Sequence, residues 1–432
     1  MFEKLKHKIN DVDTKEILTK GFSFLVFRIT GLLFGYVFAL FITRQYGAGV
    51  YGLVTLCFSL FLFISIFGRL GIDINLVKFY SNETNQKETG LFYRVLIKSI
   101  IVSSLLAACL YMFKDILVFK LFKKPLLEPY IIWIVLAIPC WSTTLICSGL
   151  LRAKKLNNWF AFLNNPGRFA FSLIAIVILW SIADNPLNAI KSHFYGVFFL
   201  AILSIIISIK TLKKISFKTN ENSWVFLKDA FPMMLSSTML IFLGWLDTFI
   251  LGIYESEETI GIYGIALKFA VLTSFVLQAI NSILAPKLAN SYTTNDMDLF
   301  KKLIQFATKL NFFLTLIIVT IIVVFRKLLL GIYGEEFVAG SIFLTVLCIG
   351  QLVNSMSGSV GVIMQMTGHQ KAYQNIVFVA LIINLILNFT LIPIYGGLGA
   401  AIATVISIST WNIAGAIYIK LKLNIASYYN PF

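Results

Sequence analysis

Residues 23–43 of the chain, SFLVFRITGLLFGYVFALFIT, contain one charged side chain, Arg28. About 20 mainly apolar residues are enough to cross a bilayer as a helix. An arginine near the centre of such a helix costs roughly 3 kcal/mol, so it needs a partner or a purpose there. The stretch therefore predicts a membrane-spanning helix with an arginine whose role the rest of the chain has to explain.

The composition extends this prediction to the whole chain. Of 432 residues, 58% are hydrophobic and only 13% are charged, far from the balance of a soluble protein. The sequence predicts an all-α polytopic membrane protein with about twelve transmembrane helices. The predicted spans are 20–43, 51–75, 94–113, 130–152, 159–183, 189–209, 224–252, 260–285, 303–325, 338–363, 375–395 and 397–419.

The basic residues predict the orientation. Of 36 lysines and arginines, 21 belong to the N-terminal arm, the loops after even-numbered spans and the C-terminal tail, and 8 belong to the loops after odd-numbered spans. Basic residues accumulate on the cytoplasmic side, so both termini are predicted to be cytoplasmic. The N-terminus is too polar to begin a signal peptide and is expected to remain as a cytoplasmic arm. The formal charge of +16 lies in clusters between apolar runs, which favours membrane lipids as partners and no nucleic acid.

An internal repeat divides the chain. GVYGLV at 49–54 opens the second predicted span, and GIYGIA at 261–266 opens the eighth. Six helices separate the copies, which predicts parallel repeats and two six-helix lobes related by pseudo-two-fold symmetry, with a central cavity and alternating access. The predicted N-lobe covers residues 1–210, a polar cytoplasmic linker covers 211–223, and the C-lobe covers 224–432.

Polar residues within the spans predict the cavity walls. Arg28 shares a helical face with Gly31 and Gly35, so we expect that face to contact protein or a cavity. Asn164, Arg168 and Ser172 would form a stripe on the fifth span. Gln351 on the tenth span and Asn384 on the eleventh extend the polar set into the C-lobe.

Several charged residues admit a structural explanation. Arg69 lies four residues before Asp73, and a local ion pair would account for both as well as a substrate contact would. Asp247 and Lys268 are predicted at similar depth, either as a buried pair that joins two helices or as part of ion coupling or gating. For Arg28 and Arg168 a functional role is favoured, because the N-lobe has no equally deep carboxylate. Its cavity should therefore be positive and select an anion, and arginine suits a phosphate group.

The remaining motifs exclude other classes. The chain has no phosphate-binding loop for ATP hydrolysis, and its three histidines show no metal-binding spacing, so no cofactor or metal is expected. The loops leave no room for a catalytic domain, so the chain is predicted not to be an enzyme. Transport would be driven by a proton or sodium gradient, by the membrane potential or by consumption of the substrate on the far side.

Three segments resemble a known family. Residues 21–81, 261–292 (GIYGIALKFAVLTSFVLQAINSILAPKLANSY) and 384–407 (NLILNFTLIPIYGGLGAAIATVIS) are similar to O-antigen and capsule repeat-unit flippases of the multidrug/oligosaccharidyl-lipid/polysaccharide exporter superfamily. The resemblance implies flipping of an undecaprenyl-diphosphate-linked oligosaccharide across the bacterial inner membrane for O-antigen, lipopolysaccharide or capsule synthesis, with polysaccharide polymerase machinery as a candidate partner.

By analogy with this superfamily and from helix position, the diphosphate is expected near Arg28 and Arg168, with Lys268 facing it and Arg69, Asn164, Gln351 and Asn384 as further substrate-binding candidates. A lipid II type flippase and a drug exporter of the same superfamily remain alternatives. A membrane-embedded polymerase is disfavoured, because the outer loops are short.

Overall fold

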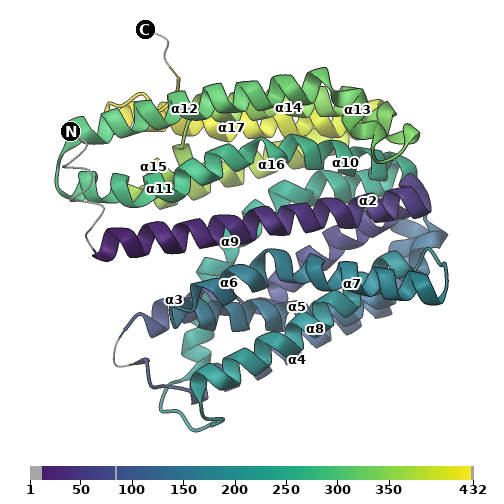
Figure 1. Cartoon of the computed structure of the whole chain (residues 1–432), viewed down its shortest axis with the longest axis horizontal. Coiled ribbons are helices and arrows are strands. Elements are labelled where there is room, and N and C mark those ends of the chain that lie inside the picture. Colours follow the sequence, from purple (N-terminus) through teal and green to yellow (C-terminus); the bar gives the residue numbers. More distant parts are fainter. Residues whose placement is uncertain (1–11, 83–84, 430–432) are drawn as a thin grey trace. The chain divides into compact units, whose positions relative to one another are not determined.

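The computed structural model describes residues 12–82 and 85–429, and residues 1–11 of the predicted arm lie outside this description. The described chain is built from helices and short connections (Figure 1). The α-helices are α2 (Val12–Arg69), α3 (Ile72–Tyr80), α4 (Gly90–Met112), α5 (Glu128–Ala153), α6 (Asn157–Asn164), α7 (Pro166–Ile182), α8 (Asn188–Leu212), α9 (Ser223–Tyr254), α10 (Glu257–Leu272), α11 (Ser274–Thr293), α12 (Met297–Val324), α13 (Arg326–Gly331), α14 (Ser341–Ser357), α15 (Val360–Met366), α16 (Gln370–Tyr395) and α17 (Gly397–Leu423). Shorter helical pieces are η2 (Ile116–Leu121), η3 (Pro125–Leu127) and η4 (Glu335–Gly340).

The number of long apolar helices agrees with a polytopic membrane protein. In the described part of the chain, nine helical segments are long and apolar enough to cross a membrane. Two bent pairs, α6 with α7 and the two parts of α9, raise the number to eleven. The predicted number of about twelve spans is consistent with this range and stays a prediction, and α2 contains one interruption of its helical geometry.

The interruption of α2 lies at Gly47, whose φ of 80° and ψ of 179° are outside the helical region. The prediction of a loop at residues 44–50 is wrong, because helix continues on both sides of this single residue. A helix that restarts exposes unsatisfied amide groups. Here the Glu336 carboxylate accepts a hydrogen bond from the Ala48 amide at 2.6 Å. The Arg44 guanidinium donates to the Ile332 carbonyl at 2.6 Å, so both sides of the break are anchored.

The second predicted span also ends earlier than expected. α2 stops at Arg69, Leu70 and Gly71 have φ values of 54° and 72°, and α3 then begins at Ile72. Two successive residues in the left-handed region end a helix, because L-residues rarely continue a right-handed helix from there. The span predicted as 51–75 is therefore two helices separated by a sharp turn.

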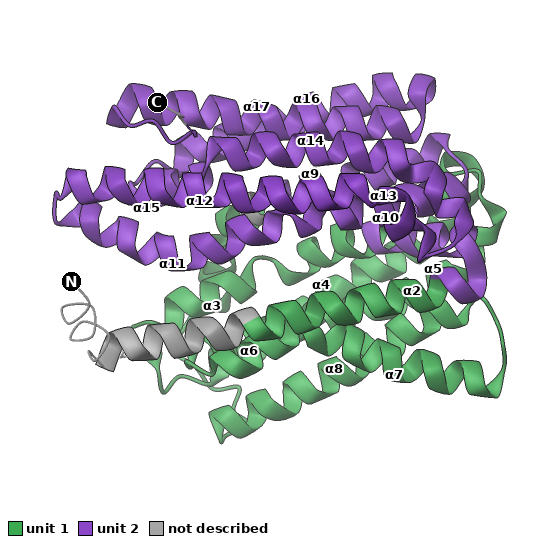
Figure 2. Ribbon diagram, turned by 45° about the horizontal axis from the view of Figure 1, so that its top comes forward, with its two compact units in different colours: residues 1–42, 60–238 green, residues 43–59, 239–432 purple. Residues whose placement is uncertain are grey.

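The chain forms two compact units, and unit 1 comprises residues 1–42 and 60–238 (Figure 2). Within it α8 packs against both α5 and α7, and α5 also contacts α3 and α4. One part of its core is formed by α3, α4 and α5, with Ile72, Leu76, Phe92, Val95, Ile146 and Leu150 buried together.

Unit 2 comprises residues 43–59 and 239–432. Here α17 packs against α14 and α16, and α12 against α11 and α14. Its core includes a cluster of Leu288, Phe300, Ile304, Ile363, Met364 and Ile419. The division into lobes at 211–223 stays a prediction, as do the symmetry and the central cavity.

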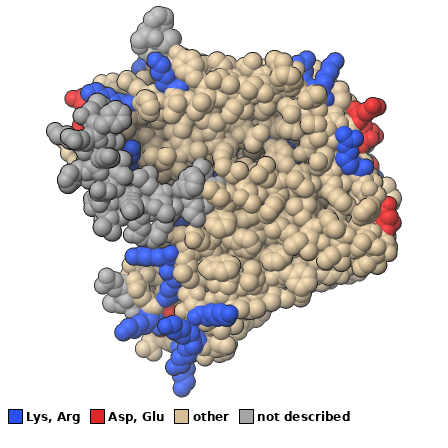
Figure 3. All heavy atoms as spheres, viewed as in Figure 1, with Lys and Arg blue, Asp and Glu red and all other residues tan. Residues whose placement is uncertain are grey.

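The surface is that of a membrane protein. Large apolar side chains are exposed along the helices, among them Leu105 at 65%, Phe306 at 68% and Ile317 at 56%. In Figure 3 the charged side chains gather at the ends of the helices, and the helix surfaces between them are almost uncharged. Such surfaces are stable in contact with lipid rather than water.

Candidate functional site

The predicted protein-facing side of the first span is confirmed by its packing in unit 1. A Cβ built on Gly31 would lie 2.7 Å from the carbonyl carbon of Asn165, and one on Gly35 would lie 3.2 Å from the Phe169 ring. Small residues at these positions allow α2 to approach the junction of α6 and α7 closely. Arg28, half-buried and one turn before Gly31, occupies the same face.

Arg168 lies near the start of α7, in the middle of the predicted fifth span. Its guanidinium carbon is 4.4 Å from the centroid of the Phe169 ring and 5.3 Å from that of Trp141 on α5. Cation–π contacts of this kind stabilise a cation in an apolar setting and hold the side chain in place. The backbone of Arg168 is also fixed, because Ser172 donates to its carbonyl at 2.8 Å.

The predicted stripe of Asn164, Arg168 and Ser172 is interrupted. α6 and α7 meet at Asn165 with a 50° bend, and Pro166 starts the new helix without an amide hydrogen to continue the old one. Asn164 therefore belongs to α6, where its amide donates to the Phe160 carbonyl at 2.9 Å. Only Arg168 and Ser172 share an uninterrupted helix.

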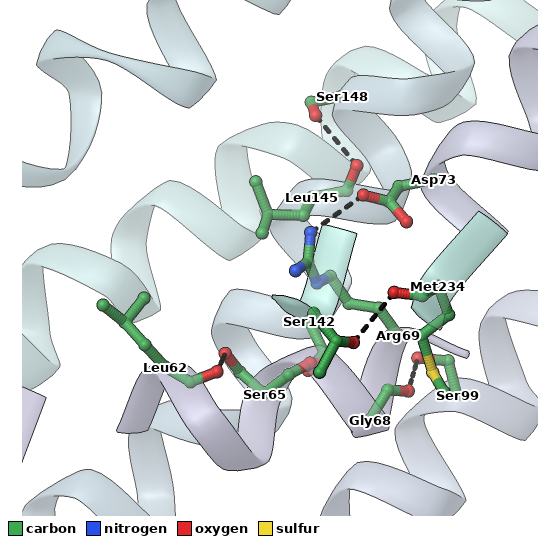
Figure 4. A network of polar contacts seen from close by, with 11 residues as sticks. Leu62, Ser65, Gly68, Arg69, Asp73, Ser99, Ser142, Leu145, Ser148 and Met234 are labelled. Carbon is green, nitrogen blue, oxygen red and sulfur yellow. Dashed lines mark hydrogen bonds and ion pairs between the residues drawn. The ribbon is translucent and has the colours of Figure 1, made fainter. Parts of the chain in front are cut away.

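Arg69 forms the local ion pair considered from the sequence. Its guanidinium lies 2.8 Å from the Asp73 carboxylate, across the turn between α2 and α3 (Figure 4). Next to it, Ser99 donates to the Gly68 carbonyl at 2.7 Å, which ties the end of α2 to α4. The pair therefore has a structural role at this turn, and binding of substrate by Arg69 stays a prediction.

Asp247 is the deeply buried carboxylate of unit 2, with 2% exposure. It accepts hydrogen bonds from Tyr263 on α10 at 2.5 Å, from Thr404 on α17 at 3.0 Å and from the Thr248 amide at 2.8 Å. These neutral donors, from α9, α10 and α17, hold the carboxylate in place. A pairing of Asp247 with Lys268 stays a prediction, as does a role of Asp247 in coupling or gating.

Lys268 lies on α10 beyond the repeat motif. On this helix a Cβ added to Gly261 would come within 2.2 Å of the Ala48 carbonyl oxygen. One added to Gly52 would come within 1.8 Å of the Glu257 carbonyl oxygen. The repeated motifs GVYGLV (49–54) and GIYGIA (261–266) thus cross each other at their glycines within unit 2. Lys268 comes two residues after the second motif in the sequence.

The amides predicted for the C-lobe lie inside unit 2. Gln351 is 7% exposed, and its side-chain oxygen faces the Asn354 amide nitrogen at 3.5 Å. Asn384 is 1% exposed and its side-chain oxygen accepts from Asn388 at 3.0 Å. Both side chains are buried in unit 2. Their roles in substrate binding stay predictions.

Three features of these surroundings have no clear signature in the sequence. Tyr263 and Thr404 donate to Asp247 from other helices, and Thr404 lies 157 residues further along the chain, so spacing does not indicate the contact. His193 is fully buried beside the Phe61 ring, with ring centroids 5.2 Å apart. Arg152, in the segment LLRAKKLNNWF that begins at residue 150, lines a pocket.

Two protein-family models match the chain. A family model described as polysaccharide biosynthesis protein matches residues 17–291, and one described as MatE matches residues 232–390. The probable low-salt glycan biosynthesis flippase Agl15 of Haloferax volcanii is 26% identical over 221 residues, which make up 51% of this chain and 46% of that relative. The match thus spans less than half of the relative's length.

Solved structures share the fold. A lipid II flippase MurJ in an inward closed conformation aligns with a TM-score of 0.76 and 18% identity, over 93% of this chain and 87% of that one. An inward-facing multidrug resistance MATE family transporter aligns with a TM-score of 0.71 and 14% identity, over 94% and 98% of the two chains.

The apolar helices and these alignments show the fold of a multi-pass membrane protein. The two family-model matches and the flippase relative support the multidrug/oligosaccharidyl-lipid/polysaccharide exporter superfamily. The chain belongs to the polysaccharide biosynthesis protein family, whose model matches more than half of it. The predicted superfamily and all-α polytopic fold are confirmed. The relatives are described as flippases and transporters, which agrees with the prediction that the chain is not an enzyme.

Proposed function

We propose that the chain flips an undecaprenyl-diphosphate-linked oligosaccharide from the cytoplasmic to the outer leaflet of a bacterial inner membrane, for O-antigen or capsule synthesis. Both termini would be cytoplasmic, and the movement would be alternating access. Family membership and the flippase relative support this class of activity. A polysaccharide polymerase would act on the flipped product and is the expected partner.

The main support for this proposal is the excess of positive charge in the predicted spans of unit 1. The spans of its six predicted helices contain Arg28, Arg69 and Arg168, whereas Asp73 is the one acidic residue that they contain. Asp73 is paired with Arg69, so the remaining balance of these spans is positive. A positive potential inside a low-dielectric membrane protein attracts anions and disfavours cationic drugs.

Arginine chemistry supports a diphosphate in particular. The planar guanidinium offers two parallel donors to two phosphate oxygens, and the rings of Trp141 and Phe169 hold the Arg168 guanidinium in a fixed orientation. Arg28 lies on the face of α2 that packs toward the start of α7, where Arg168 is located. Lys268, Gln351 and Asn384, which belong to unit 2, are further proposed substrate-binding residues.

Asp247 is proposed as the residue that couples flipping to a proton or sodium gradient. A carboxylate with 2% exposure is costly to keep charged. Tyr263 and Thr404 stabilise the charged form, so binding and release of a cation there would change the contacts of three helices at once. Coupling of this kind predicts that an imposed gradient accelerates flipping only while Asp247 is present.

The test is flipping of a purified undecaprenyl-diphosphate oligosaccharide in proteoliposomes. We expect Arg28→Ala and Arg168→Ala to abolish flipping. Lysine at either position should restore part of it, because lysine keeps the positive charge but lacks the planar guanidinium that can bind two phosphate oxygens at once. Arg326→Ala is the matched control, because Arg326 donates to the Val323 carbonyl of the preceding helical turn.

Three outcomes would contradict the proposal. Equal flipping rates in wild type and in both alanine variants would show that these two arginines do not bind the substrate. Movement of a cationic drug, with no flipping of the diphosphate lipid, would favour a drug exporter. Preference for lipid II over other diphosphate-linked glycans would favour the cell-wall precursor as substrate.

A further inference from the structure

Unit 1 contains a pocket that is separate from the mid-membrane arginines. Its volume is about 530 Å³, within the ~300–1,000 Å³ range of sites for small ligands. It is lined by residues of α3, the end of α5, α6 and the first part of α9, all at the predicted cytoplasmic end. Ile74, Val77 and Met233 supply apolar lining.

Two features of the backbone open this pocket. The turn at Leu70 and Gly71 redirects the chain so that α3 lies against α5. At their contact a Cβ on Gly149 would lie 2.4 Å from the Asp73 carbonyl oxygen. The contact depends on glycine, and the small residues Ser148 and Gly149 leave the adjoining space open.

The charged lining is predominantly basic. Lys78 on α3 and Arg152 at the end of α5 line the pocket, and both are exposed. Among the described residues, no carboxylate lies within ion-pairing distance of either. Asp73 is the acidic member, and its charge is matched by Arg69 at 2.8 Å. The lining itself holds two positive charges and one negative charge, and the neighbouring Arg69 offsets the charge of Asp73, so the potential in the pocket is positive.

The positive side chains are arranged for a phosphate group. The Arg152 guanidinium carbon lies 5.1 Å from the centroid of the Phe160 ring, which also lines the pocket. Stacking on a ring restrains the guanidinium while its donors remain directed outward. The amide of Asn164 adds a polar group on the same wall.

We infer that this pocket is a loading site for the diphosphate of a polyprenyl-diphosphate lipid, bound by Lys78 and Arg152. The apolar wall formed by Ile74 and Val77 receives the first part of the prenyl chain. The inference rests on the proposed function, because it assigns a docking step that precedes passage along the mid-membrane arginines. The shared chemistry of its ligands is a phosphate attached to an apolar chain.

The test measures binding without transport. The full chain in neutral nanodiscs is titrated with undecaprenyl diphosphate, with inorganic diphosphate and with phosphatidylglycerol vesicles. We expect Lys78→Gln and Arg152→Gln each to weaken binding of undecaprenyl diphosphate about tenfold, the usual effect of losing one charged hydrogen bond. Lys214→Gln, an exposed lysine of the predicted linker outside this pocket, is the matched control and should bind like wild type.

The probes separate the sources of the phosphate. Competition by inorganic diphosphate, with no effect of phosphatidylglycerol, supports recognition of the diphosphate itself. Displacement by phosphatidylglycerol would overturn the inference in favour of a site for ordinary lipid headgroups. Unchanged affinity in both glutamine variants, or an equal loss in Lys214→Gln, would also overturn it.

Flipping assays distinguish this inference from the proposed function. If wild type flips the substrate while both pocket variants bind and flip normally, the pocket assignment fails and the proposed function stands. If binding depends on Arg152 but wild type flips no diphosphate lipid, the proposed function fails and the pocket remains a binding site for diphosphate lipids.

Discussion

Replacing Gly52 with alanine is expected to destabilise unit 2 through one added methyl group. The new Cβ would lie 1.8 Å from the Glu257 carbonyl oxygen, at the crossing of α2 and α10. Contacts below 3.0 Å are not tolerated, so the two backbones would have to separate by about 1.2 Å, which is 3.0 minus 1.8. Overpacking of this kind typically costs about 1–3 kcal/mol.

Gly49→Ala is the matched control in the same motif, because a Cβ at Gly49 meets nothing within 4 Å. Alanine is a better helix former than glycine, so this variant should equal or slightly exceed wild type in stability. The assay is reversible unfolding of the purified protein in mixed micelles, followed by tryptophan fluorescence. The crossing would be refuted if the Gly52→Ala free energy of unfolding stayed within about 0.5 kcal/mol of wild type, or if Gly49→Ala lost as much.

Two further perturbations test other parts of the molecule. Exchanging Asp247 and Lys268 should not restore the flipping that Asp247→Asn loses, since Tyr263 and Thr404 donate to the carboxylate at its present position; recovery to near the wild-type rate in proteoliposomes would support the ion-pair explanation. Gly71→Ala should lower the free energy of unfolding by about 1–3 kcal/mol, because φ is 72° and the Cβ would lie 2.4 Å from the Ala230 carbonyl oxygen. Gly244→Ala, whose Cβ meets nothing within 4 Å, is its control in the same unfolding assay, and equal effects of the two variants would contradict this reasoning.

The spans could be predicted from the sequence because hydropathy acts over about 20 residues and needs no knowledge of distant contacts. The interruptions could not. Gly47 is a single non-helical residue within α2, and its neighbouring amide is satisfied by Glu336, 288 residues further along the chain. The turn at Leu70 likewise has no local signature, because leucine seldom adopts a positive φ.

For the candidate site, local contacts were predictable and distant ones were not. The pairing of Arg69 with Asp73 follows from a spacing of four residues. For Asp247 the sequence offered two explanations, a pairing with Lys268 and a role in coupling or gating. The hydroxyl groups of Tyr263 and Thr404 that donate to this carboxylate come from other helices, and hydroxyl-bearing residues are too common in the sequence to single out.

The membership of residues 43–59 in unit 2 has a consequence for any division of the chain. The backbone passes from one unit to the other three times, after residues 42, 59 and 238. A cut in the segment 211–223 would therefore give two fragments, each holding a piece of the other's packed unit. Such fragments resemble the partners of a domain-swapped dimer, which complete each other by exchange. Neither fragment would contain a complete unit, so each would lack part of the packing that its own helices require.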